Sequence, residues 1–247
     1  MPIIMRTENL CRHFGGVIAN NAINVEFRAN KLKSIIGPNG AGKTTFINII
    51  TGLLPSTSGL VFYQDHDITD SPPHELFKLG ICRTFQITSI FPGLTTFENV
   101  RIAKQSQRGG SLRLFSTKES LKEVNDETWV ILKRLHLVEM ANVLSENLSH
   151  GDQRVLEIAL AMAGNAKILF LDEPTAGMSS GEAEHISSLI KGLTDSMSVV
   201  LIEHDMDIVM SISDEIIVMN QGKIIAEGSP QEIQLNEKVK EAYLGTK

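Results

Sequence analysis

One short run of residues carries the strongest chemical signal in this sequence, because residue types and spacing match the pattern G-x-x-x-x-G-K-[ST]. The matching residues are Gly37, Pro38, Asn39, Gly40, Ala41, Gly42, Lys43 and Thr44. Glycines let successive backbone N–H groups turn toward an anion, and a helix that begins directly afterwards presents its positive end to the same anion. A lysine here can reach the outer phosphates of a nucleotide, and a threonine hydroxyl can bind Mg²⁺. The pattern predicts that residues 37–44, with Thr45 beside them, bind a nucleoside triphosphate.

A second chemical signal lies further along the chain, where the apolar run 168–171 ends in Asp172 and Glu173. A buried strand that ends this way can hold its first carboxylate beside Mg²⁺ and its second near an attacking water molecule. Two acids after a strand are also common where a polar loop simply begins. Their position downstream of residues 37–44 is what favours transfer of a phosphoryl group to water.

The elements around these motifs alternate between strand and helix, which predicts an α/β fold with a mainly parallel sheet. The expected buried strands are 32–36, 168–171, 199–202 and 216–219, and the expected helices are 43–52, 181–193 and 205–212. Short β-type runs broken by turn residues predict an N-terminal antiparallel β subdomain over residues 5–28, with a further strand at 60–63. Residues 94–165 have a helical pattern. We therefore expect one domain over residues 1–247, with an inserted helical subdomain at about 94–165.

Composition and charge exclude several classes of protein. The net charge is −6, with 29 acidic against 23 basic residues, which argues against broad nucleic-acid binding. Cys11 and Cys82 form neither a metal-binding spacing nor a disulfide framework. The N-terminus has no signal-peptide pattern, and no apolar run approaches the roughly 18 residues of a membrane-spanning helix. We expect a soluble, cytosolic chain.

With both motifs in this order, the chain resembles the ATP-binding subunits of ABC transporters over nearly its whole length. The resemblance implies a P-loop ATPase core, ATP and Mg²⁺ as ligands, and a role for each matching residue. It implies that Phe14 stacks on adenine and that Gln86, in the segment 83–86, contacts Mg²⁺ and the water. It further implies Thr44, Gln86 and Asp172 as metal ligands, and Glu173, His204 and Gln86 as catalytic residues. Taken alone, Phe14 could equally be a core aromatic residue and His204 a structural histidine.

The segment 147–154 occupies the place of the family's signature motif, Leu-Ser-Gly-Gly-Gln, and departs from it. His150 and Asp152 replace the first glycine and the glutamine. In the family, this segment caps the nucleotide held by a second subunit, which implies that role for Ser149 and Gly151. Asp152 adds negative charge near a phosphate-binding helix end, or caps the helix. Ser179 stands where the family commonly has an aspartate that couples the two sites. Because Glu173 is intact, we expect this chain's own site to hydrolyse ATP.

In these departures and in the tail residues 242–245, the chain resembles one ATP-binding subunit of the branched-chain amino acid importers and their urea and amide relatives. The resemblance implies uptake of branched-chain amino acids or a related small polar solute, driven from the cytoplasmic face of the inner membrane. It implies three kinds of partner: a second, related ATP-binding subunit, two transmembrane permeases, and an extracytoplasmic solute-binding protein acting indirectly. The expected coupling surface is about 87–94. Its apolar residues either form a socket for a permease helix or pack internally; they are Ile90, Phe91, Pro92 and Leu94.

Other classes of P-loop protein fit the sequence less well. The ATPase of lipopolysaccharide export shares a similar tail, but His150, and Glu203 before His204, weaken that interpretation. ABC proteins that act on DNA or the ribosome usually carry two nucleotide-binding domains or a long coiled-coil insertion, and this sequence shows neither. A P-loop kinase of small molecules needs neither a signature motif nor a downstream histidine.

Overall fold

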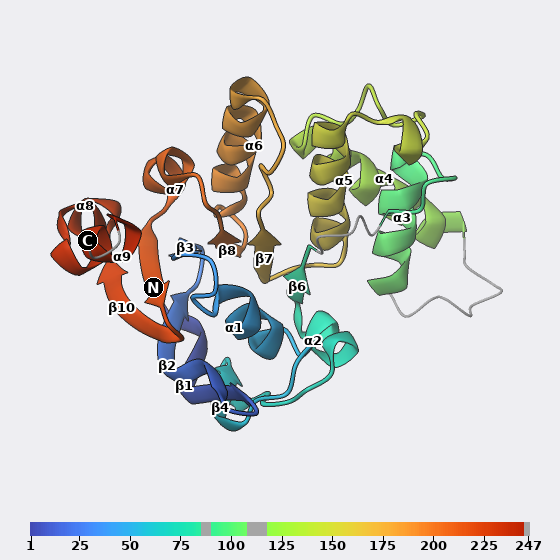
Figure 1. The fold of residues 1–247 in the computed structure, drawn as a ribbon. Coiled ribbons are helices and arrows are strands. Elements are labelled where there is room, and N and C mark those ends of the chain that lie inside the picture. Colours follow the sequence, from blue (N-terminus) through green and yellow to red (C-terminus); the bar gives the residue numbers. More distant parts are fainter. Residues whose placement is uncertain (85–89, 108–117, 245–247) are drawn as a thin grey trace.

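The computed structural model describes residues 1–84, 90–107 and 118–244. Two β-sheets organise this part of the chain (Figure 1). The antiparallel sheet has the strand order β2-β1-β4-β5 and contains the predicted N-terminal hairpin. Its strands are β1 (Ile3–Phe14), β2 (Val17–Arg28), β4 (Ser58–Tyr63) and β5 (His66–Asp67). Both hairpin strands run longer than the predicted short segments, because register shifts accommodate the residues that interrupt the β pattern.

The larger sheet has the strand order β10-β9-β3-β8-β7-β6, and its strands are parallel except for β10 at one edge. This arrangement confirms the predicted α/β class with a mainly parallel sheet. Its strands are β3 (Leu32–Ile36), β6 (Ile81–Arg83), β7 (Ile168–Asp172), β8 (Ser198–Ile202), β9 (Glu215–Asn220) and β10 (Lys223–Gly228). The sequence did not predict β6 or β10, the two edge strands.

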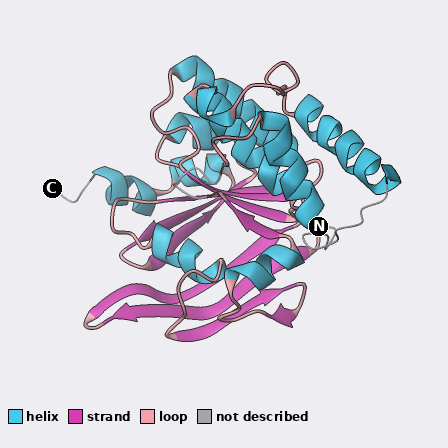
Figure 2. Cartoon of the chain, turned by 90° about the vertical axis from the view of Figure 1, so that its right-hand side faces the viewer, coloured by secondary structure: helices cyan, strands magenta, loops and turns pink. Residues whose placement is uncertain are grey.

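Helix α1 (Lys43–Ile50) lies between the two sheets (Figure 2). Phe46 of α1 stacks on Phe27 of β2 with ring centroids 6.5 Å apart, and Phe27 meets Phe170 of β7 edge-on at 6.2 Å. These three rings join the antiparallel sheet, the helix and the parallel sheet into one buried cluster. The shorter helix α2 (Pro73–Leu79) adds Leu76 to the same cluster. The first helix after the phosphate motif is therefore fixed on both sides.

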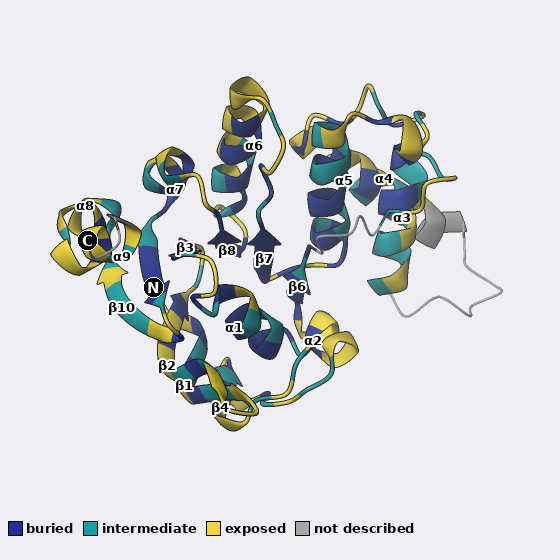
Figure 3. Ribbon diagram, viewed as in Figure 1, coloured by how far each residue is buried: buried dark blue, intermediate teal, exposed yellow. Residues whose placement is uncertain are grey.

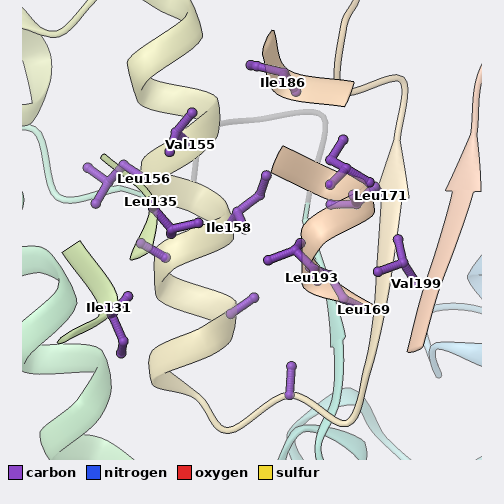
Figure 4. Packing of buried hydrophobic residues seen from close by; sticks show 14 of the residues in the cluster. Ile131, Leu135, Val155, Leu156, Ile158, Leu169, Leu171, Ile186, Leu193 and Val199 are labelled. Carbon is purple, nitrogen blue, oxygen red and sulfur yellow. The ribbon is translucent and has the colours of Figure 1, made fainter. Parts of the chain in front are cut away.

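Helices cover the opposite face of the parallel sheet. Side chains alternate along β7, so that Ile168 and Phe170 face α1 while Leu169 and Leu171 pack with α5 and α6 (Figure 4). The described helices on this side include α3 (Thr96–Gln107), α4 (Lys118–Arg134), α5 (His150–Ala163) and α6 (Ser180–Leu193), with a short 3₁₀ turn at Ser145–Asn147. Helices α3, α4 and α5 gather at one side of the molecule (Figure 1), as the helical pattern over 94–165 predicted.

The C-terminal residues pack against the strand that leads into the phosphate motif. Helices α7 (Met206–Ile212), α8 (Pro230–Leu235) and α9 (Glu237–Leu244) contribute to a cluster that also contains Ile36, the last residue of β3. Val239 of α9 is buried in this cluster, whereas much of the outer surface of α8 and α9 is exposed (Figure 3). Within the described ranges, no helix combines the length and apolar character needed to cross a membrane.

Candidate functional site

The predicted phosphate-binding residues form the loop between β3 and α1, and strand β2 packs against this loop. Gly42 has a left-handed backbone with φ 98°, and a Cβ atom there would lie 2.3 Å from the carbonyl oxygen of Ala19. The side-chain amide of Asn20 donates to the Gly42 carbonyl at 3.1 Å. Only glycine satisfies both the backbone angle and the close approach of β2. The N-terminal hairpin therefore helps to set the shape of the loop.

Lys43 folds across the loop that precedes it. Its ammonium group donates to the carbonyl oxygens of Gly37 at 2.6 Å and of Pro38 at 3.2 Å. Burial lowers the pKa of Lys43, although the nearby carboxylates of Glu173 and Asp172 act in the opposite direction. The structure thus brings the lysine of the first motif together with both acids of the second. Thr44, by contrast, is exposed at the start of α1, and Thr45 is half-buried.

Asp172 ends β7 as a buried carboxylate with a cationic partner that the sequence analysis missed. The guanidinium of Arg83, at the end of β6, donates to Asp172 Oδ2 at 2.9 Å and to Asn48 Oδ1 of α1. The two charged side chains are 8% and 2% exposed. The only sequence signal for this contact was the position of Arg83 in the quoted segment 83–86. Gln86 itself lies outside the described residues.

Glu173 and His204 meet at the ends of neighbouring strands. Glu173 Oε1 lies 2.8 Å from His204 Nε2, and the pairing of β7 with β8 ends shortly before these two residues. Glu173 has a left-handed backbone with φ 48°, an uncommon conformation for a residue with a side chain. Its backbone N–H donates to the carbonyl oxygen of Ile202 at 2.9 Å. The structure therefore joins two of the predicted catalytic residues in one contact.

Phe14 lies at the end of β1, in the hairpin that braces the loop at Gly42. Its ring is 47% exposed, and the guanidinium of Arg12 sits 4.6 Å from the ring centroid. An exposed aromatic ring with a cation on one face is available for stacking on a further planar group. The core interpretation of Phe14 is therefore wrong, whereas its contact with adenine stays a prediction.

The predicted signature residues lie at the N-terminus of α5. The Ser149 hydroxyl accepts from the backbone N–H of Asp152 at 3.1 Å and donates to the Asp152 carboxylate at 2.7 Å. Asp152 thus takes part in capping the helix. Gly151 lies close to Glu182 in the first turn of α6, where Glu182 caps that helix together with Ser179. Within the described residues, no hydrogen bond joins Ser149 to the loop 37–44, so the structure does not bring these two predicted sites together in one chain.

The C-terminal helix also touches the phosphate loop. The hydroxyl of Tyr243 in α9 lies near the backbone of Gly37; burial raises the pKa of Tyr243, whereas the Gly37 backbone N–H acts in the opposite direction. Gly37 therefore lies near Tyr243, and its carbonyl oxygen accepts a hydrogen bond from Lys43. The tail residues 242–245 contributed to the family resemblance, but no site residue was predicted among them.

A largely apolar groove of about 940 Å³ runs between α2, β6, α3 and α5. Phe91 lines this groove and is more than half exposed, whereas Ile90 packs against the helical core. Ile90 therefore follows the internal-packing alternative, whereas a permease contact of Phe91 stays a prediction. Four further apolar residues line the groove and were not part of the predicted surface: Leu53, Phe77, Ile102 and Leu160.

Comparison with protein families identifies this arrangement. A family model described as ABC transporter matches residues 20–176, more than half of the chain, including the phosphate loop and both acids. This chain belongs to the ABC transporter ATP-binding family. A second model, described as branched-chain amino acid ATP-binding cassette transporter, matches residues 223–247 of this ABC ATPase.

Individual relatives of the ABC ATPase align over nearly its whole length. It is 39% identical over 249 residues to the high-affinity branched-chain amino acid transport ATP-binding protein LivG of Escherichia coli (strain K12), covering 98% of each chain. It is also 39% identical over 252 residues to the probable LivG of Archaeoglobus fulgidus, covering 98% of this chain and 95% of the relative. These matches show an ATPase subunit of a transport system, a class that works with membrane permease subunits.

Solved structures share the fold of the ABC ATPase. One is the ADP conformation of an ATP-binding cassette, at 32% identity and a TM-score of 0.86, covering 100% of both chains. Another is a nucleotide-free cassette, at 32% identity and a TM-score of 0.84, covering 99% of this chain and 100% of that one. The predicted P-loop ATPase fold is confirmed, and the ABC ATPase is a nucleotide-binding protein.

Proposed function

We propose that this ABC ATPase hydrolyses ATP to energise the import of branched-chain amino acids or a related small polar solute. The contact of Glu173 with His204 carries the catalytic part of the proposal, because it joins a carboxylate and an imidazole beside Lys43. The names of the relatives that align over 98% of the chain, and the match of residues 223–247, support the amino-acid substrate class.

In the proposed site, the loop 37–44 and Thr45 bind the phosphates of ATP. Backbone N–H groups surround the anion, and the first turn of α1, which contains no acidic residue, adds the positive end of a helix dipole. The Lys43 ammonium exchanges its contacts with the Gly37 and Pro38 carbonyls for contacts with phosphate oxygens. Phe14 stacks on adenine through the ring face that Arg12 leaves free.

The residues at the site have the chemistry that Mg²⁺ prefers. Thr44 and Asp172 offer a hydroxyl and a carboxylate, and Gln86 would add an amide oxygen. Among the described residues, no three His, Cys, Asp or Glu side chains form a metal cluster, which suits an ion that is completed by phosphates and water. When bound, Mg²⁺ neutralises charge on the phosphate oxygens.

Hydrolysis requires that a water molecule attack the γ-phosphorus while the bond to the bridging oxygen breaks. In this proposal, Glu173 accepts a proton from this water, and His204 contacts the γ-phosphate oxygens. Ser149 and Gly151 lie away from this chain's own loop, so they are suited to cap ATP held by a second subunit. Two subunits would then close over two ATP molecules, and Ser149 and Gly151 would complete the partner's site.

We further propose that residues 1–247 form one nucleotide-binding domain, with 94–165 as its inserted helical part, at the cytoplasmic face of the inner membrane. Its proposed partners are a second, related ATP-binding subunit, two permeases and, indirectly, an extracytoplasmic solute-binding protein. The groove between α2, β6, α3 and α5 is the proposed socket for a short permease helix. Its exposed apolar side chains, Phe77, Phe91 and Ile102, support this role.

Affinity purification of the tagged chain from native membranes, followed by mass spectrometry, tests this proposal. Two multi-spanning proteins and a related ATPase are the expected companions, and Ile102→Asp should reduce their recovery. Val130→Asp is a matched control, because Val130 is exposed on α4 and does not line the groove. Recovery as a homodimer without membrane proteins, or with ribosomal or lipopolysaccharide-export proteins, would overturn the import assignment.

Catalysis is tested on the same complex by Glu173→Gln. The amide cannot accept the proton of the attacking water, so ATP turnover should fall by about 100-fold or more while ATP binding is retained. A variant that turns over ATP at the original rate would exclude Glu173 as the general base.

A further inference from the structure

Glu203 is a buried acid to which neither the proposed reaction nor the proposed binding site assigns a role. It follows β8 directly and is 4% exposed, whereas the next residue, His204, is exposed. A buried carboxylate is costly unless hydrogen bonds satisfy its oxygens. The partners of Glu203 therefore indicate what its position contributes.

Those partners lie on the two chain segments that carry Glu173 and His204. One oxygen, Oε1, accepts from the backbone N–H of Thr175 at 3.1 Å and from the Thr175 hydroxyl at 2.5 Å. The other oxygen, Oε2, accepts from the backbone N–H of His204 at 3.0 Å. Thr175 itself is buried, two residues beyond Glu173. One oxygen of this side chain thus connects the loop after β8 to the loop after β7, and the other holds the backbone of His204 within its own loop.

We propose that Glu203 is a positioning residue that holds Glu173 and His204 in register for ATP hydrolysis. The backbone bond from Glu173 to Ile202 joins the two loops at one point, and the bonds from Thr175 to Glu203 join them at a second point. The bond from His204 N–H to Glu203 then ties the histidine backbone to the same side chain, and the His204 imidazole meets the Glu173 carboxylate. A side chain with two acceptor oxygens is needed, because both loops present N–H donors.

The same contacts extend toward the surface that would face a second subunit. From Thr175 a tight turn follows, in which Met178 N–H donates to the Thr175 carbonyl, and Ser179 then caps α6. Glu203 therefore joins the histidine expected to contact the γ-phosphate to the segment 175–179. This inference rests on the proposed roles of Glu173 and His204.

The test uses the complex recovered with its membrane partners and compares Glu203→Gln, Thr175→Val and Thr175→Ser. Glu203→Gln introduces an amide that can be oriented in two ways. In one orientation its NH₂ group faces the N–H of Thr175, and in the other it faces the N–H of His204. We expect the ATPase kcat of Glu203→Gln to fall by about 10- to 100-fold, because small displacements of catalytic groups have effects of that size. The dissociation constant for ADP should change less than about twofold, since the phosphate loop makes none of these contacts.

Thr175→Val should also lower kcat, because it removes the hydroxyl that donates to Glu203. Thr175→Ser, which keeps the hydroxyl, should retain the original kcat.

Two results would overturn the inference. One is an unchanged kcat for Glu203→Gln; the other is a fall in kcat matched by an equal loss of ADP affinity, which would indicate general disruption. The variant His204→Ala separates this inference from the proposed function. If His204→Ala loses turnover while Glu203→Gln keeps it, only the role of Glu203 is wrong. If His204→Ala turns over normally, the proposed role of His204 fails.

Discussion

Arg83 and Asp172 form a buried ion pair at the ends of the parallel strands β6 and β7, with Arg83 Nη2 2.9 Å from Asp172 Oδ2. Asp172 is the proposed Mg²⁺ ligand, and Arg83 also donates to Asn48 of α1. The guanidinium therefore orients the carboxylate and connects it to the helix that follows the phosphate loop. The position of Asp172 depends on β6 as well as on its own strand.

Loss of this ion pair should reduce stability. Arg83→Met leaves the Asp172 carboxylate buried without its cation, a change that typically costs about 3–5 kcal/mol. Urea unfolding of the purified chain measures the loss. Lys240→Met is a control, because the exposed pair of Lys240 with Glu237 should contribute less than about 1 kcal/mol. Equal effects of the two substitutions would contradict the importance assigned to the buried pair.

The negative charge of Asp152 should restrain ATP turnover at the site that α5 is proposed to cap. Asp152→Asn removes a negative charge near the expected phosphate position, and one such charge at about 4 Å in water corresponds to about 1 kcal/mol. We therefore expect ATPase activity of the assembled complex to rise, by roughly fivefold. Asp195→Asn makes the same charge change in an exposed turn and should have no effect. Lower activity of Asp152→Asn would mean that capping of α5 is the dominant contribution.

A single methyl group at Gly42 should deform the phosphate loop. The Cβ atom of Gly42→Ala would lie 2.3 Å from the Ala19 carbonyl oxygen and 2.8 Å from the Asn20 amide nitrogen, in a left-handed backbone. We expect nucleotide affinity, measured by calorimetric titration with ADP, to fall at least about tenfold, since this strain exceeds about 1.4 kcal/mol. Gly181→Ala in α6 meets open space and should bind ADP normally.

Asp214 should make the fold sensitive to acid. Burial raises its pKa, but hydrogen bonds from the backbone of Leu32 and from Lys191, with the charge of Lys31, outweigh burial and leave the pKa lowered. A carboxyl whose folded pKa lies below its unfolded value, about 3.9, stabilises the fold above that pH. This stability is lost as pH falls through the folded pKa. The Tm of the original protein should therefore exceed that of Asp214→Asn at pH 7, and the difference should shrink toward pH 3.

The sequence predicted those elements whose own residues form a recognisable apolar pattern. The strands β7, β8 and β9 were predicted because each contains a short, uninterrupted apolar run, and the helices α6 and α7 because helical stretches separate these runs. By contrast, β6 spans only Ile81–Arg83 and shows no periodicity; it is a strand because β7 offers an edge for pairing. Helix α8 could have been predicted, since Ser229, Pro230 and Glu232 form a capping signal at its start.

The site was predicted as a set of motifs, whereas the contacts between motifs were not. Chain order indicated Lys43, Asp172, Glu173 and His204, and the structure brings these together. The partners that orient them come from distant parts of the sequence, as with Arg83 and Asp172. No spacing rule connects such residues, because the order of strands in the sheet decides which of them meet.

The proximity of Tyr243 to Gly37 of the phosphate loop offers a spectroscopic probe. The chain contains two tyrosines, and the other, Tyr63, donates to the carbonyl of Leu79, the last residue of α2. Protein labelled with 3-fluorotyrosine should therefore give a simple ¹⁹F spectrum. The Tyr243 resonance would respond to rearrangement at Gly37 as nucleotide enters, and the Tyr63 resonance would serve as an internal reference. The nucleotide site can thus be followed through a residue that is expected to make no contact with the ligand.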